Sequence, residues 1–190
     1  MEPNFESPQS ELPQSPHENL LEADGAAFPS FWQNLQNQDV LLVGWGHGRL
    51  AESLIQAGNT LTCIETSLDL ISKARDFTES HHMEMIHGDF LNFPDFSAQQ
   101  FSAVVTSLVA EPIKDLTHLC QQAVTVLKND GVFYLSEVHP ESAPPANHIH
   151  DEEAITVAAT QAGLDLQRTE IKYSMKDLKA LIQMWEFRTS

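Results

Sequence analysis

The amino-acid sequence predicts an α/β fold with a doubly wound, mostly parallel sheet. Apolar runs with strand character alternate with segments of helical spacing, and parallel neighbouring strands need such crossover connections. One run, Phe101 to Thr106, is apolar on both faces, as a central parallel strand is. The length of 190 residues and the hydrophobic content of 42% allow one domain with a substantial core.

The first 25 residues have a composition typical of a disordered acidic tail. Four prolines stand among Ser, Gln and Glu, so the segment has little apolar surface to bury. It is acidic because no Lys or Arg precedes Arg49. We therefore expect a tail over residues 1–25 and a folded domain over residues 26–190. An alternative is that the tail folds over the functional site as a lid, anchored by Phe5, Leu12 and the Leu20-Leu21 pair.

The folded domain is expected to open with a short helix between Ala26 and Leu35. Pro29 suits a first helical turn, and aromatic residues recur there at helical spacing. The elements expected after Glu65 are a helix capped by Ser67, a strand at Met83–His87, the strand at Phe101–Thr106, a helix with its buried stripe between Leu116 and Leu127, a strand at Val132–Val138, a helix at Ala154–Ala162 closed by Gly163, and a strand at Leu166–Tyr173.

The stretch from Val40 to Glu65, VLLVGWGHGRLAESLIQAGNTLTCIE, predicts one strand–helix–strand unit with a glycine-rich loop. The loop carries glycine at every second position: Gly44, Gly46 and Gly48. Glycine lets the backbone turn sharply and lets a ligand approach closely, while the following helix offers unpaired N–H groups. Glu65 ends the second strand roughly 20 residues on, where an acidic side chain can accept hydrogen bonds from a ribose. These features predict a nucleotide-type site.

The C-terminal segment from Ser174 onward is compatible with either a helix or a strand. Ser174 and Asp177 form a possible capping box, and several apolar residues after them have helical spacing. Between Leu181 and Phe187, however, apolar and polar residues alternate as they do in a strand.

Charge restricts the partners. Ten Lys and Arg against 27 Asp and Glu give a net charge of −17, which disfavours nucleic acid and anionic membranes and favours a small-molecule or cationic substrate. No apolar run approaches the ~20 residues of a membrane span, so we expect a cytoplasmic protein. Cys63 and Cys120 are expected to be small buried hydrophobic residues. No cluster of Cys or carboxylate residues at zinc-like spacing accompanies the histidines, so we expect no metal site. The oligomeric state stays open.

The glycine spacing separates two classes of nucleotide-binding enzyme. A dinucleotide fingerprint has its third glycine where this chain has Arg49, which disfavours a nicotinamide-dependent oxidoreductase. The segment VLLVGWGHGRLA instead resembles the first motif of class I S-adenosylmethionine-dependent methyltransferases, usually VLDLGCGTGRLA. Gly88-Asp89 and the stretch FSAVVTSLVAEPIKDL are also similar to segments of that family. Leu42 and Trp45 depart from the motif, which usually has an acidic and a small residue there.

The resemblance implies a seven-stranded Rossmann-like sheet with helices on both faces and an antiparallel last strand, here at about Ala180 to Arg188. It implies S-adenosylmethionine as cofactor. The residues that it places at the cofactor are Gly44, Trp45, Gly46, Gly48, Glu65, Thr66, Asp89, Phe90 and Ser107.

The resemblance also implies methyl transfer to a small-molecule acceptor. Where that acceptor must lose a proton, the candidate bases are Glu111 and His139 at strand ends facing the pocket, with Glu137 the weaker candidate. The alternative is a methyltransferase-like binding or scaffold protein without turnover, because Leu42 and the bulk of Trp45 alter the methionine end of the site.

Overall fold

The computed structural model describes residues 16–81, 83–93, 96–109, 113–143 and 150–189. Its α-helices are α1 (Pro16–Ala27), α2 (Ala51–Gln56), α3 (Leu68–His81), α4 (Leu116–Val126) and α5 (Glu152–Gln161). Its strands are β1 (Asp39–Val43), β2 (Thr60–Glu65), β3 (Glu84–His87), β4 (Phe101–Ser107), β5 (Leu127–Val138), β6 (Leu164–Tyr173) and β7 (Ala180–Thr189). Three 3₁₀ turns complete the list: η1 (Phe28–Trp32), η2 (Gly46–Gly48) and η3 (Phe90–Asn92).

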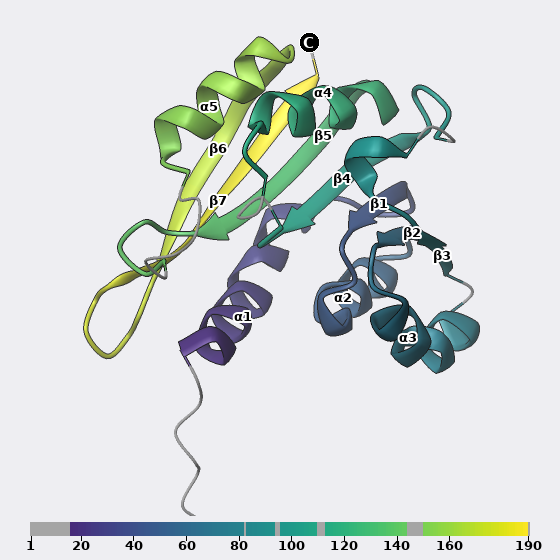
Figure 1. The fold of residues 1–190 in the computed structure, drawn as a ribbon, viewed down its shortest axis with the longest axis horizontal. Coiled ribbons are helices and arrows are strands. Elements are labelled where there is room, and N and C mark those ends of the chain that lie inside the picture. The colour runs from purple at the N-terminus through teal and green to yellow at the C-terminus, as the bar shows by residue number, and fades with distance from the viewer. Residues whose placement is uncertain (1–15, 82, 94–95, 110–112, 144–149, 190) are drawn as a thin grey trace, which may run out of the picture.

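The seven strands form one sheet in the order β3-β2-β1-β4-β5-β7-β6 (Figure 1). The pairs from β3 to β5 are parallel, and β7 lies antiparallel between β5 and β6. The predicted seven-stranded, mostly parallel sheet with an antiparallel last strand is therefore confirmed. The order reverses between β1 and β4, and ligands of such sheets bind at the carboxyl ends of the strands beside this point.

The C-terminal segment is a strand, as the resemblance implied. β7 pairs with a neighbour along both edges, including Leu135 with Trp185 and Thr169 with Trp185. These ladders satisfy the backbone groups of the segment on both sides, and this outweighs its local helical spacing. Ser174 does not cap a helix; it accepts a hydrogen bond from the N–H of Lys176 in the turn before β7.

Alternation along the strands divides the buried side chains into two cores. On β1, Leu42 belongs to the cluster that includes residues of α1, α2 and α3, whereas Leu41 belongs to the cluster with α4 and α5. The two sets of helices lie on opposite sides of the sheet (Figure 1). The central strands β1, β2, β4 and β5 each contribute apolar residues to both clusters, which explains their continuous apolar runs.

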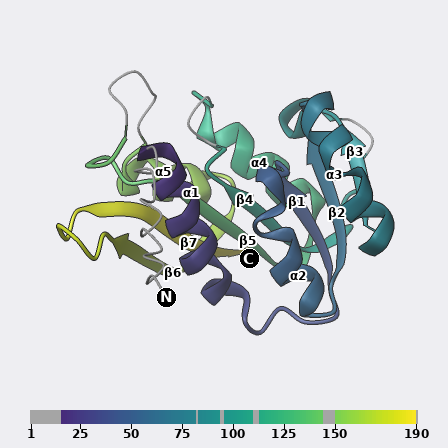
Figure 2. The same ribbon diagram turned by 90° about the horizontal axis from the view of Figure 1, so that it is seen from below.

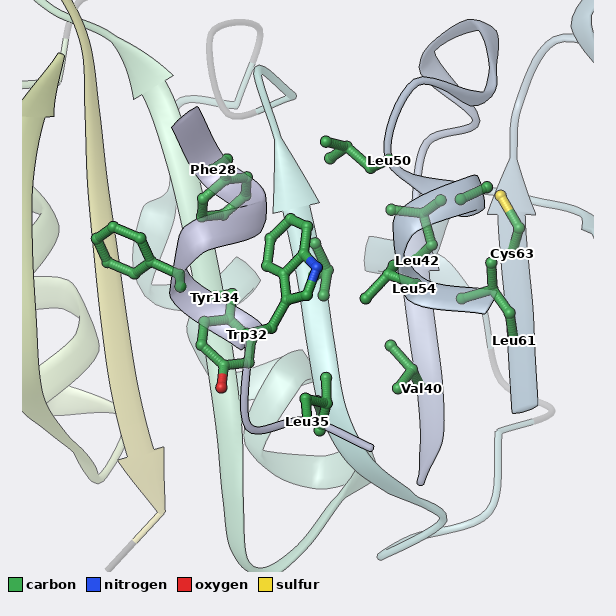
Figure 3. Packing of buried hydrophobic residues seen from close by; sticks show 14 of the residues in the cluster. Phe28, Trp32, Leu35, Val40, Leu42, Leu50, Leu54, Leu61, Cys63 and Tyr134 are labelled. Carbon is green, nitrogen blue, oxygen red and sulfur yellow. The ribbon is translucent and has the colours of Figure 1, made fainter. Parts of the chain in front are cut away.

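The short turn η1 packs aromatic rings onto β5. The ring of Trp32 lies edge-on to Tyr134 with centroids 5.9 Å apart, and to Phe28 with centroids 4.8 Å apart. Figure 3 shows these rings on one side of the cluster and Leu42 beside Leu54 of α2 on the other. The helical turn expected between Ala26 and Leu35 is present, with Pro29 at its start.

The N-terminal region differs from the expectation for its second half. Residues 16–25, expected in the disordered tail, lie in α1, which packs against β6 and β7 on the sheet side shown in Figure 2. Leu20 and Asp24, four residues apart on α1, are buried, and Phe28 continues this spacing directly after the helix, so one face of α1 is held against the sheet. Phe5 and Leu12, the other anchors of the alternative lid, lie outside the described residues.

Both cysteines are buried and unbridged, as expected. Burial raises the pKa of the Cys120 thiol to about 12, and burial together with the Glu65 carboxylate raises the pKa of the Cys63 thiol even further. Neither thiol therefore forms the reactive thiolate near neutral pH.

We expect both thiols to resist a thiol-specific reagent such as dithionitrobenzoate at pH 8 in the folded protein, since the raised pKa values keep them protonated. Unfolding in guanidinium should release two reactive thiols per chain, which is the cysteine content of the sequence. Rapid release of the chromophore from folded protein would show that a thiol is accessible and ionised.

Candidate functional site

The glycine loop links β1 to α2 through a sharp backbone turn. Gly44 has φ = 83°, and an added Cβ there would lie 3.1 Å from the side chain of Val109. A side chain at this position would therefore be strained by its backbone and crowded by the segment after β4. The loop needs glycine at Gly44, as the sequence predicts.

Glu65 fastens the loop to the end of β2. Its Oε2 atom accepts a hydrogen bond from the N–H of Trp45 at 2.8 Å, and its Oε1 atom accepts one from the N–H of Ser67 at 2.8 Å. The side chain of Thr66 adds a longer bond of 3.3 Å. A carboxylate has about four lone-pair sites, so Glu65 keeps capacity to accept further hydrogen bonds from a ligand.

A cavity of 310 Å³ opens at the carboxyl ends of β1, β2 and β3. It brings together five of the predicted cofactor residues, namely Gly44, Glu65, Thr66, Asp89 and Phe90. Its other walls are mostly apolar and include Val43, Ile64, Leu108, Val109 and Ile113. An apolar cavity with a few convergent polar groups is the usual form of a small-molecule site, and the volume lies at the lower end of about 300–1,000 Å³.

Asp89 and Phe90 follow β3, which is two strands from β1 and its glycine loop in the sheet order. Asp89 begins η3, where its carboxylate accepts hydrogen bonds from the N–H of Leu91 at 3.1 Å and from the Asn92 amide at 2.7 Å. Phe90 is buried and packs toward Phe96, with ring centroids 6.3 Å apart. The turn thus holds an exposed carboxylate beside an apolar ring.

Trp45 points away from the cavity. Its ring lies 5.2 Å from Phe77 of α3 in an edge-on arrangement and is almost fully buried. It also packs under Gly48, where a Cβ would come within 2.6 Å of the indole. Trp45 therefore serves the site with its backbone N–H, which bonds Glu65, and its bulk lies in the core.

Ser107 lies in a polar cluster outside the cavity lining. Its hydroxyl donates to Asp24 of α1 at 2.6 Å, and Asp24 also accepts from the Ser136 hydroxyl at 2.5 Å. Arg49 completes the cluster with an ion pair to Asp24 at 3.1 Å. Asp24, Arg49 and Ser136 were not identified from the sequence; the spacing of Leu20, Asp24 and Phe28 is the signal that could have found Asp24.

The structure describes two of the three candidate bases, Glu137 and His139. Glu111 lies outside the described residues. His139 directly follows the carboxyl end of β5. Its backbone N–H donates to the carbonyl of Leu181 at 2.9 Å, and its ring Nδ1 atom accepts from the backbone N–H of Glu141 at 3.3 Å. Glu137 is buried in β5. Of the candidate bases that the structure describes, His139 is the one with its side chain partly open at the end of a strand.

The described residues contain no group of three or more His, Cys, Asp or Glu side chains that could hold a metal ion. None of their helices is both long and apolar enough to cross a membrane.

Known proteins with similar sequences are methyltransferases. The ubiquinone biosynthesis O-methyltransferase of Glaesserella parasuis is 27% identical over 112 residues, which is 55% of this chain and 47% of that protein. The protein of the same name from Actinobacillus pleuropneumoniae is 28% identical over 111 residues, with the same shares. The match thus spans about half the length of these relatives.

The fold and a family model agree with these relatives. The structure of an S-adenosylmethionine-dependent methyltransferase from Mesorhizobium loti superposes with a TM-score of 0.76 at 13% identity, covering 88% of this chain and 99% of that one. A family model described as a methyltransferase domain matches residues 41–135, from β1 through the glycine loop, Glu65 and Asp89 to β5. The chain therefore belongs to the class I S-adenosylmethionine-dependent methyltransferase family.

Proposed function

We propose that this protein transfers a methyl group from S-adenosylmethionine to a small-molecule acceptor. The observation that carries the proposal is the Glu65 carboxylate, which fixes the glycine loop through Trp45 and lines the 310 Å³ cavity with acceptor capacity to spare. The names of the relatives support the reaction class, because they are O-methyltransferases.

The cavity fits the nucleoside part of this cofactor. Glu65 would accept a hydrogen bond from a ribose hydroxyl, since its Oε2 atom accepts one hydrogen bond, from Trp45, and keeps a second lone pair. The exposed carboxylate of Asp89 would accept from the adenine amino group, and the ring of Phe90 would pack on the purine. At Gly44 the missing Cβ leaves the cavity open beside the loop.

The bound cofactor supplies a sulfonium methyl group, which leaves by in-line displacement, so the protein mainly has to position the acceptor. His139 is proposed to do so. Because its Nδ1 accepts the N–H of Glu141, the neutral ring carries its proton on Nε2 and can donate to an acceptor oxygen. To take the acceptor's proton, His139 would need the other tautomer, with a lone pair on Nε2, and the long 3.3 Å hydrogen bond from Glu141 to Nδ1 would have to break.

The acceptor is proposed to be a small molecule and not nucleic acid. A net charge of −17 opposes the binding of phosphate backbones, which requires clustered cations. The alternative of a scaffold protein without turnover loses one of its reasons, since the bulk of Trp45 lies against Phe77 and not among the residues that line the cavity. Leu42 was the other argument for that alternative; it is a buried core residue that lies beside Leu54 (Figure 3).

Binding of the cofactor tests the site. We expect S-adenosylhomocysteine to bind wild-type protein with micromolar affinity in isothermal calorimetry, and Glu65→Gln to bind it roughly tenfold or more weakly, because two charge-assisted hydrogen bonds are weakened. The matched control is Glu52→Gln in α2, whose carboxylate bonds only the exposed side chain of Gln56 among the described residues. Equal affinity in wild type and Glu65→Gln would remove Glu65 from the cofactor site.

Turnover tests the reaction. Incubation with methyl-labelled S-adenosylmethionine and a library of phenols, catechols, carboxylates and amines should label at least one acceptor. On a hydroxyl acceptor, His139→Gln should lower kcat about 100-fold or more while cofactor affinity stays unchanged, since general-base catalysis contributes about this much. His118→Gln in α4 is the control histidine. Binding of cofactor without labelling of any acceptor would favour the scaffold alternative.

A further inference from the structure

A second cavity lies at the opposite end of the sheet from the glycine loop. It has a volume of 410 Å³, and its lining includes Gln38 just before β1 and Ser102 at the start of β4. Val132 of β5 and Arg188 of β7, which pair across the sheet, also line it. The cavity thus lies toward the amino ends of the parallel strands, whereas the cavity proposed for the cofactor lies at their carboxyl ends.

Tyr134 gives this cavity a buried hydroxyl that has no hydrogen-bond partner among the described residues. Only 5% of the residue is exposed, because its ring packs edge-on against Trp32. Figure 3 shows the hydroxyl at the end of the ring that points away from Phe28. Burial raises the pKa of Tyr134 to about 12, so the group is an O–H donor at neutral pH. Buried donors are normally paired, and the cavity is where a partner can bind.

The register of the strands places two charged residues beside this hydroxyl. Tyr134 lies opposite Glu186 of β7, and Glu186 lies opposite Arg168 of β6. All three residues line the cavity. The guanidinium of Arg168 is held 4.2 Å from the ring centre of Phe31, and its Nε atom donates to Glu170 at 2.8 Å. A hydroxyl, a carboxylate and an oriented guanidinium therefore form one row across three strands.

The charged groups of this row keep capacity for a ligand. Within the described part of the chain, the Glu186 carboxylate has no hydrogen bond or ion pair, although a carboxylate has about four lone-pair sites. Arg168 bonds Glu170 through Nε and Nη2, so the N–H groups of Nη1 are left. Arg188 makes one long hydrogen bond of 3.4 Å to the carbonyl of Asp130. Acceptors and donors with spare capacity thus line the same cavity.

The lining is balanced in charge. Its cations are Arg168 and Arg188, and its anions are Asp130 and Glu186. Most of its other polar members carry amide or hydroxyl groups, among them Gln33, Asn34 and Gln38. In a chain of net charge −17, a cavity with as many cations as anions favours neither a simple anion nor a simple cation. A ligand that carries both charges matches it best.

We propose that this cavity is a second ligand site, which binds a free amino acid or a similar small zwitterion. Arg168 would bind the carboxylate of the ligand through charge-assisted hydrogen bonds, and the Tyr134 hydroxyl would donate to the same group. Glu186, between them in the row, would accept from the ammonium group. Because the site lies away from the cofactor cavity, its ligand is neither the cofactor nor the methyl acceptor, and the inference does not depend on the proposed function.

The two tyrosines of the chain allow a test in the wild-type protein. Carbon-13 labelling of the ring carbon that bears the hydroxyl should give two NMR signals, which either Tyr→Phe variant assigns. In titrations with each standard amino acid, at least one should shift the Tyr134 signal with a Kd below ~1 mM. The signal of Tyr173, which is 48% exposed near the other end of β6, should stay in place. A shift of Tyr173 alone, or of neither signal, would overturn the proposal.

Matched analogues test the class of ligand. The amino acid that binds best is compared with the acid that lacks its amine and with the amine that lacks its carboxylate. Each analogue should bind about tenfold or more weakly, since each loses a charge-assisted interaction. An acid that binds as tightly as the amino acid would make this an anion site and would contradict the assignment of Glu186.

Two variants test the residues themselves. Tyr134→Phe removes only an unpartnered hydroxyl, so it should melt at the temperature of wild type yet bind the amino acid about fivefold or more weakly. Tyr173→Phe is its matched control and should bind as wild type does. Glu186→Gln should reduce the preference for the amino acid over the acid without its amine. Wild-type affinity and preference in both variants would show that the amino acid binds elsewhere.

Discussion

The contact between the Glu65 carboxylate and the N–H of Trp45 is the one on which the site depends. It joins the end of β2 to a loop that follows β1, 20 residues earlier in the chain, and it is buried. A buried charged acceptor must be hydrogen-bonded, and here backbone N–H groups of Trp45 and Ser67 do this. The loop is therefore shaped before a ligand arrives, and the carboxylate that shapes it also lines the cavity.

The features that could be predicted from the sequence are the local ones. The glycine-rich turn, the acid at the end of β2 and the apolar strands each have a signal within a short window, and the structure contains all three features. Of the loop glycines, Gly44 lines the cavity, whereas Gly46 and Gly48 are not among its lining residues. The C-terminal strand was decided by family resemblance, because pairing with β5 and β6 joins residues far apart in the chain. Local pattern cannot supply a partner strand of that kind.

What the sequence did not predict depends on the direction of side chains and on long-range pairs. Trp45 was expected at the cofactor, but its ring turns toward Phe77 of α3, a partner 32 residues away. Asp24 was assigned to a polar tail, yet it is buried by contacts with Ser107 and Ser136. A lone acid in a proline-rich, acidic segment looks solvated until the arginine and hydroxyls that pair with it are placed.

The two parts of the proposed site come from different parts of the chain. The cavity proposed for the cofactor is built from the ends of β1 to β4 and the segments that follow them, which lie within the matched family region. A second hollow, a groove of 700 Å³, lies between α1 and the turn from β6 to β7. Lys172, Lys176 and Lys179 are among the residues that line it. Its wall residue Leu181 accepts the N–H of His139, which ties this groove to the proposed acceptor side. The residues that line this groove and those that line the cavity have no member in common, and α1 contacts the glycine loop through the Asp24–Arg49 pair.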